Sequence, residues 1–138
     1  MLVTLTSLSG IFGEVLGGIF SDTLGRIKTV RFGIILMIIS VMLLLLKSPV
    51  FVLAFLMIAW GFGWTLNHAG LSTMLTDLPK EFLNEAASLN SSVRFVSGGL
   101  GAALAGVIMQ KSFHAGFVVM GSGLLILLLL SRRLLAVK

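Results

Sequence analysis

The segment Gly18-Ile19-Phe20-Ser21-Asp22-Thr23-Leu24-Gly25-Arg26-Ile27-Lys28, called here the 18–28 loop, separates two long apolar stretches of the chain. Gly17 and Gly18 would let the end of one helix press closely against a neighbouring helix. Asp22 would leave the membrane beside a helix end. Gly25 would supply a backbone conformation that a residue with a Cβ resists. The segment therefore predicts a tight turn between two helices.

Basic residues follow this turn at once. Arg26, Lys28 and Arg31 lie within six positions of one another and would form a cluster at the level of the lipid head groups. Short loops rich in Lys and Arg stay on the cytoplasmic side of a membrane, so this cluster predicts the orientation of the helices around it.

The composition places the chain among membrane proteins. Of its 138 residues, 57% are hydrophobic and only 11% are charged, and the mean hydropathy is +1.12. These values lie well outside the soluble range. The net charge of +5 sits in short loops and at the tail, a pattern of membrane topology, and it does not indicate a nucleic-acid partner. The absence of Cys excludes disulfides, thiolate metal sites and thiol catalysis.

Five apolar runs have the length of membrane spans, which is about 17 to 25 residues. The sequence predicts an all-α membrane protein with a single transmembrane domain over residues 1–138. The spans are expected near 2–22, 30–46, 50–76, 85–110 and 113–131. The first run lacks the basic leader of a cleaved signal peptide, so we treat it as a retained helix.

The distribution of cations indicates which side each loop faces. With the 18–28 loop inside, short connections force alternating helix directions, the N-terminus lies outside and the C-terminus is cytoplasmic. The inside positions then hold Arg26, Lys28, Arg31, Lys80, Arg132, Arg133 and Lys138, and the outside positions hold Lys47 and Lys111. We therefore expect a multi-pass protein of the cell's inner or plasma membrane.

The five predicted helices differ in polarity. The runs at 30–46 and 113–131 carry almost no polar residues, so we expect both to face lipid. The runs at 2–22, 50–76 and 85–110 are rich in Gly, Ser, Thr and Asn, and we expect these to be interior, because such residues let helices approach closely or bridge between them.

The spacing Gly-x3-Asp-x2-Gly-Arg-x-Lys in the 18–28 loop resembles the signature loop of the major facilitator superfamily of secondary transporters. The segments 78–81, 86–94 and 98–103 are similar to the tenth-to-eleventh helix region of its drug:proton antiporters. The order of lipid-facing and polar helices looks like helices eight to twelve, so the resemblance implies a partial bundle from the C-terminal half. Helices two to six are the alternative, but that half usually has an Arg in its fourth helix and a Gly-Pro pair in its fifth. Neither occurs in the corresponding spans here.

The resemblance implies proton-coupled export of drugs or small molecules across the lipid bilayer. Family members alternate access between two six-helix bundles, whereas this chain supplies five helices. A missing N-terminal half, or a second copy, would then be needed, and the chain would be a fragment. The alternative is a non-transporting membrane protein or subunit that acts through helix association. No nucleophile, base and orienting residue fall at a recognisable spacing, so we expect neither an enzyme nor a cofactor.

Three ionisable residues lie inside the predicted spans. Glu14, His68 and Arg94 fall at depths of roughly 12, 13 and 15 Å from the cytoplasmic ends of their helices, counting about 1.5 Å per residue. Intramembrane charges usually pair or face water. We hypothesise that Glu14 accepts the coupled proton and that His68 or Arg94 tunes its affinity, with a purely structural Glu14–Arg94 tie as the alternative. Asn67, on the neighbouring helix face, completes the candidate proton or substrate pathway.

Two further interpretations remain open. By resemblance, Asp22 would join a charge network that holds the two halves together, either by pairing with Arg26 or at a helix N-terminus of the absent half; a plain helix-end Asp is the alternative. Trp64 and its neighbours Trp60 and Phe62 would either form an aromatic wall for an apolar substrate or serve packing. The two His residues have no ligand spacing, so no metal site is predicted.

Overall fold

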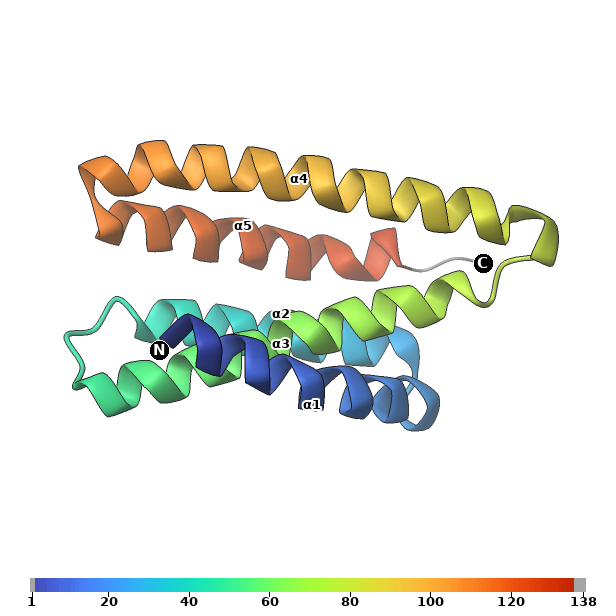
Figure 1. Cartoon of the computed structure of the whole chain (residues 1–138), viewed down its shortest axis with the longest axis horizontal. Coiled ribbons are helices and arrows are strands. Elements are labelled where there is room, and N and C mark those ends of the chain that lie inside the picture. Colours follow the sequence, from blue (N-terminus) through green and yellow to red (C-terminus); the bar gives the residue numbers. More distant parts are fainter. Residues whose placement is uncertain (1, 136–138) are drawn as a thin grey trace.

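The computed structural model describes residues 2–135, and within that range the chain is helical with no strand (Figure 1). The helices in chain order are α1 (Leu2–Thr23), α2 (Arg26–Leu43), α3 (Val50–Leu75), α4 (Leu83–Lys111) and α5 (Phe113–Leu134). A short 3-10 turn, η1 (Lys80–Phe82), leads into α4. The fold is thus an all-α bundle of consecutive helices joined by short connections.

The helix boundaries follow from local chemistry. Pro49 and Pro79 stand immediately before α3 and η1, where a missing backbone N–H costs nothing because the first helical N–H groups have no intrahelical partner. Ser112 caps the N-terminus of α5, and its side chain accepts a hydrogen bond from the backbone N–H of Ala115 at 3.2 Å. The chain turns sharply at these positions, so neighbouring helices run antiparallel.

The connection between α1 and α2 is shorter than the sequence predicts. α1 continues to Thr23 and α2 already begins at Arg26, because Gly25 turns the chain with a φ of +94°, a conformation that side chains disfavour. The expected role of Gly25 is therefore confirmed.

Replacing Gly25 with alanine is expected to lower the free energy of unfolding by roughly 1 to 3 kcal/mol, the usual cost of a residue held in a sparsely populated backbone region. Gly18→Ala is the matched control, since a Cβ there would meet nothing within 4 Å. Thermal unfolding in detergent micelles, followed by circular dichroism, measures both. Equal unfolding temperatures for the two variants would contradict the assigned strain.

The helices form two layers. Figure 1 shows α1, α2 and α3 together on one side and the α4–α5 hairpin on the other. Within the first layer α3 packs extensively against both α1 and α2, while α5 joins the layers by packing on α2 and α4. α4 and α3 touch only sparsely, so the two layers are held together mainly through α5.

Small residues allow the first layer to pack closely. A Cβ added at Gly17 would lie 2.6 Å from the Cβ of Ala69, so α1 and α3 approach too closely there for any larger residue. Between α2 and α3, Gly33 and Gly63 face each other in the same way. The predicted close approach is confirmed at Gly17 and is wrong at Gly18, which has open space around its Cα.

The expectation that α2 faces lipid is wrong, and the expectation that α4 is interior is not met within this chain alone. α2 buries one stripe at helical spacing: Thr29, Val30, Gly33, Ile34, Met37, Ser40 and Val41. α4, expected to be interior, has no buried residue. The physical reason is position: α2 lies between α3 and α5, whereas α4 has only α5 as an extensive neighbour in the described chain.

Three described segments are long and apolar enough to cross a membrane: α3, the segment Lys80–Lys111 and α5. α1 and α2 are not among these segments; the 18 residues of α2 include three cations near its start, Arg26, Lys28 and Arg31. Spans at 2–22 and 30–46, the single-domain division and the orientation of the termini therefore stay predictions.

Candidate functional site

Three ionisable side chains from three helices meet in the bundle. The His68 Nδ1 atom on α3 lies 2.8 Å from Oε1 of Glu14 on α1. On the other edge of the imidazole, the guanidinium of Arg94 on α4 contacts Nε2. His68 thus links Glu14 and Arg94, and we call these three residues the charge chain.

The chemistry of the partners assigns the proton on His68. An arginine side chain only donates hydrogen bonds, so Nε2 must be the accepting nitrogen. The proton then resides on Nδ1, which donates to the Glu14 carboxylate. In this arrangement the imidazole is neutral and lies between a cation and an anion, and each contact polarises the other.

The charge chain is open to its surroundings. The Glu14 side chain is 52% exposed and that of His68 is 25% exposed. The hydroxyl of Ser72, one helical turn beyond His68, lies 3.4 Å from Nε2 and offers a second, longer contact. The helices described here therefore do not enclose Glu14.

Two cavities adjoin the charge chain. The larger, of about 540 Å³, lies beside Trp64, Arg94 and Phe95. The smaller, of about 100 Å³, lies between α3 and α4 and is lined by both His68 and Arg94. Trp64 borders each cavity and is 54% exposed. The arrangement places an aromatic surface and a cation next to His68.

Asn67 does not join the charge chain. Its side-chain amide donates a hydrogen bond of 3.4 Å to the backbone carbonyl of Val30 on α2. Asn67 is nevertheless one of the residues lining the smaller cavity. The structure thus gives this predicted pathway residue a contact between α3 and α2.

In the 18–28 loop, Arg26 forms an ion pair with Asp77, which follows α3. The alternative in which Arg26 pairs with Asp22 is therefore wrong: among residues 2–135 Asp22 has no ion-pair partner, and it is exposed. Arg26 turns toward α3 because α2 packs on that helix. The side chain of Lys28 lines a separate cavity at this end of the bundle.

Neither Ser72 nor Asp77 is among the site residues predicted from the sequence. Ser72 was detectable, since it lies four residues after His68 on the same helix face. Asp77 carried no such signal, because its pairing with Arg26 joins two connections far apart in the sequence.

The family model of the Major Facilitator Superfamily matches residues 1–138. The chain belongs to this superfamily. Membership together with the apolar helices makes it a multi-pass membrane protein with a transporter-type function. Neither a curated protein nor a solved structure matches the chain.

Proposed function

We propose that this major facilitator chain is the C-terminal portion, helices eight to twelve, of a transporter that exports drugs or other small molecules by proton antiport. The observation that carries the proposal is the charge chain, in which His68 contacts Glu14 and Arg94 from α1 and α4. Ionisable groups inside a membrane bundle mark proton and substrate pathways.

The charge chain responds to a proton in two ways. A proton on Glu14 removes the anion that accepts from His68 Nδ1. A proton on His68 places an N–H opposite the Arg94 guanidinium, so that two donors face each other and the contact is lost. Either event loosens α1 or α4 from α3, which links proton binding to helix arrangement.

Substrate binding is proposed for the cavity beside Trp64 and Arg94. Its aromatic border suits an apolar molecule, and its volume of about 540 Å³ is in the range of small-molecule sites, which is roughly 300 to 1,000 Å³. An apolar molecule filling this cavity would hold Arg94 against His68, which is the arrangement of the unprotonated charge chain. Substrate binding would then favour release of the proton, as antiport requires.

Transport by this mechanism needs further helices. The charge chain is partly exposed and α4 has no buried residue, so a second bundle would complete the pathway. We propose a missing N-terminal half, or a second copy, as this bundle, with Asp22 contacting it on the cytoplasmic side. In this arrangement the N-terminus is outside, the C-terminus is cytoplasmic, and the membrane is the inner or plasma membrane.

A non-transporting membrane subunit is the second candidate. The close glycine contacts of α1 and α2 with α3 favour it, because they give the first layer a packed interior without any partner.

Glu14→Gln distinguishes the two, because glutamine keeps the shape of the side chain and cannot carry the proton. The test uses inverted membrane vesicles that contain the full transporter expressed from its native gene and that have an acidic interior. Addition of a lipophilic dye substrate outside the vesicles should release protons from the interior. We expect Glu14→Gln to abolish this release and Glu85→Gln, an acidic residue in the first turn of α4, to leave it unchanged. Full proton release by Glu14→Gln would refute the coupling role, and no release by the native protein would favour the subunit.

A further inference from the structure

A separate cavity, of about 530 Å³, opens at the end of the bundle that carries the 18–28 loop. Its walls come from α1, α2 and α5. Three cations line it, and its bulky apolar residues include two phenylalanines and an isoleucine: Lys28, Arg31, Arg132, Phe20, Phe32 and Ile35. It is separate from the charge chain, and neither Glu14 nor His68 borders it.

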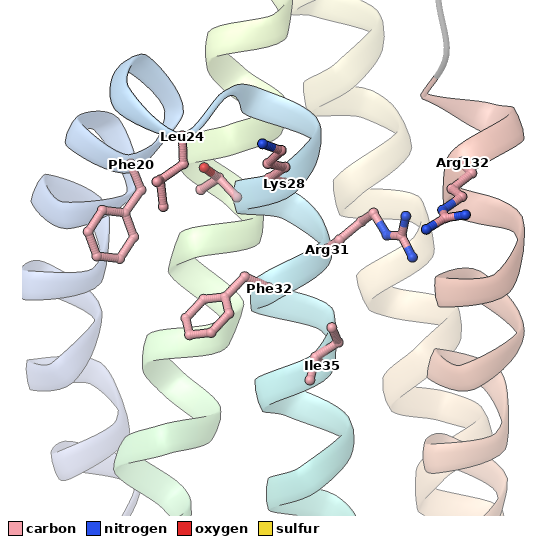
Figure 2. Close-up of a pocket in the computed structure, with 8 residues that line it drawn as sticks. Phe20, Leu24, Lys28, Arg31, Phe32, Ile35 and Arg132 are labelled. Carbon is pink, nitrogen blue, oxygen red and sulfur yellow. The ribbon is translucent and has the colours of Figure 1, made fainter.

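Among residues 2–135, the three cations have no acidic partner. Across residues 2–135 the ion pairs involve other side chains, and no carboxylate reaches Lys28, Arg31 or Arg132. Figure 2 shows the guanidinium groups of Arg31 and Arg132 turned toward one another from α2 and α5. Like charges in this position repel, so an anion held between them would be stabilised by both.

The apolar side of the cavity has a definite direction. Ile35 lies one helical turn after Arg31 on α2, and Figure 2 shows it farther from the loop end than the cations. Phe32 and Ile35 are 51% and 39% exposed. The cavity is therefore basic at the helix ends and apolar along the helix toward the centre of the membrane.

We propose that this cavity binds an anionic membrane phospholipid. Its phosphate lies between Arg31 and Arg132, and one acyl chain lies along Phe32 and Ile35. A free phosphate would match the cations and leave the apolar wall uncovered, whereas a phospholipid matches both. Basic pockets between membrane helices at the cytoplasmic face are suited to such head groups.

The bound lipid has a structural consequence. The two layers of the bundle are joined mainly through α5, and Arg31 and Arg132 lie on α2 and α5. A phosphate held by both would strengthen that junction and replace a repulsion with an attraction. This inference requires only that the chain lies in a bilayer, and it is independent of the proposed transport.

Native mass spectrometry of the purified chain in a non-ionic detergent tests the proposal. Phosphatidylglycerol, phosphatidylcholine and inorganic phosphate are added separately, and the bound fraction is measured at each concentration. We expect phosphatidylglycerol to bind tightest. The double variant Arg31→Gln/Arg132→Gln should weaken it by about 25-fold, since each cation near the membrane surface contributes roughly a factor of five.

The matched control is Lys47→Gln/Lys111→Gln, which removes the same charge at the opposite end of the bundle and should bind phosphatidylglycerol like the native chain. Circular dichroism verifies that each variant is folded. If the double variant does not fold, the single variant Arg132→Gln, at an exposed position, replaces it in the binding measurement. Equal affinity for phosphatidylcholine, equal loss in the control, or inorganic phosphate binding as tightly as the lipid would each overturn the proposal.

Discussion

Replacing Gly33 with alanine is expected to lower the free energy of unfolding by about 1 to 3 kcal/mol, the typical cost of overpacking a well-packed interior. The added Cβ would lie 2.6 Å from the backbone carbonyl oxygen of Gly63 and 2.9 Å from the backbone N of Asn67. Both atoms belong to the backbone of α3, so no side chain can rotate away. α2 and α3 must therefore separate along their contact.

Gly106→Ala is the matched control, because a Cβ at this position of α4 meets nothing within 4 Å. Alanine is a better helix former than glycine by about 1 kcal/mol, so the control should be neutral or slightly stabilised. Unfolding in mixed micelles with increasing denaturing detergent gives both values. A Gly33→Ala chain at least as stable as Gly106→Ala would show that the α2–α3 contact is not close-packed.

Gly33 also shows why hydropathy failed to sort the helices. Lipid tails are as apolar as a leucine side chain, so an apolar helix looks the same in sequence whether it faces lipid or protein. The stripe of α2 that includes Gly33 and Ser40 becomes visible only once α3 and α5 are placed on either side of it. For α4 the composition indicates that small and polar residues need a neighbour, but it does not say which chain supplies that neighbour.

The charge chain was more accessible to prediction. Counting residues from the helix ends places Glu14, His68 and Arg94 at nearly the same depth, and the structure brings all three into contact. Depth does not fix the rotation of each helix, so the central position of His68 did not follow from the sequence. For the same reason the sequence did not show that the side chain of Asn67 faces α2, where it donates to the backbone carbonyl of Val30.

Arg94→Gln alone is expected to abolish proton-coupled export and to destabilise the bundle. Without the guanidinium, Glu14 remains an anion inside a membrane bundle with only a neutral imidazole to donate to it. The double variant Glu14→Gln/Arg94→Gln removes both charges and should recover most of the lost stability. The interaction energy between the two sites is expected at roughly 0.5 to 3 kcal/mol, as for residues in one hydrogen-bonded network.

Transport separates the two interpretations of this recovery. If Glu14 and Arg94 only tie α1 to α4 through His68, the double variant should regain export along with stability. If Glu14 carries the proton, the double variant folds normally and still fails to export, because no charge remains to be neutralised. We expect the second result, measured as dye export at several pH values together with thermal unfolding of all four proteins in the cycle.

The control for this cycle is the pair Arg26→Gln/Asp77→Asn, which removes an ion pair near the ends of α2 and α3. Asp77 is 62% exposed, and exposed ion pairs of this kind contribute only about 0 to 1 kcal/mol to the free energy of unfolding. The control therefore tests whether the loss of any ion pair lowers stability as much as Arg94→Gln does. Export with native pH dependence from the Glu14→Gln/Arg94→Gln double variant would reduce the charge chain to a structural link. The proton would then have to enter through a residue outside it.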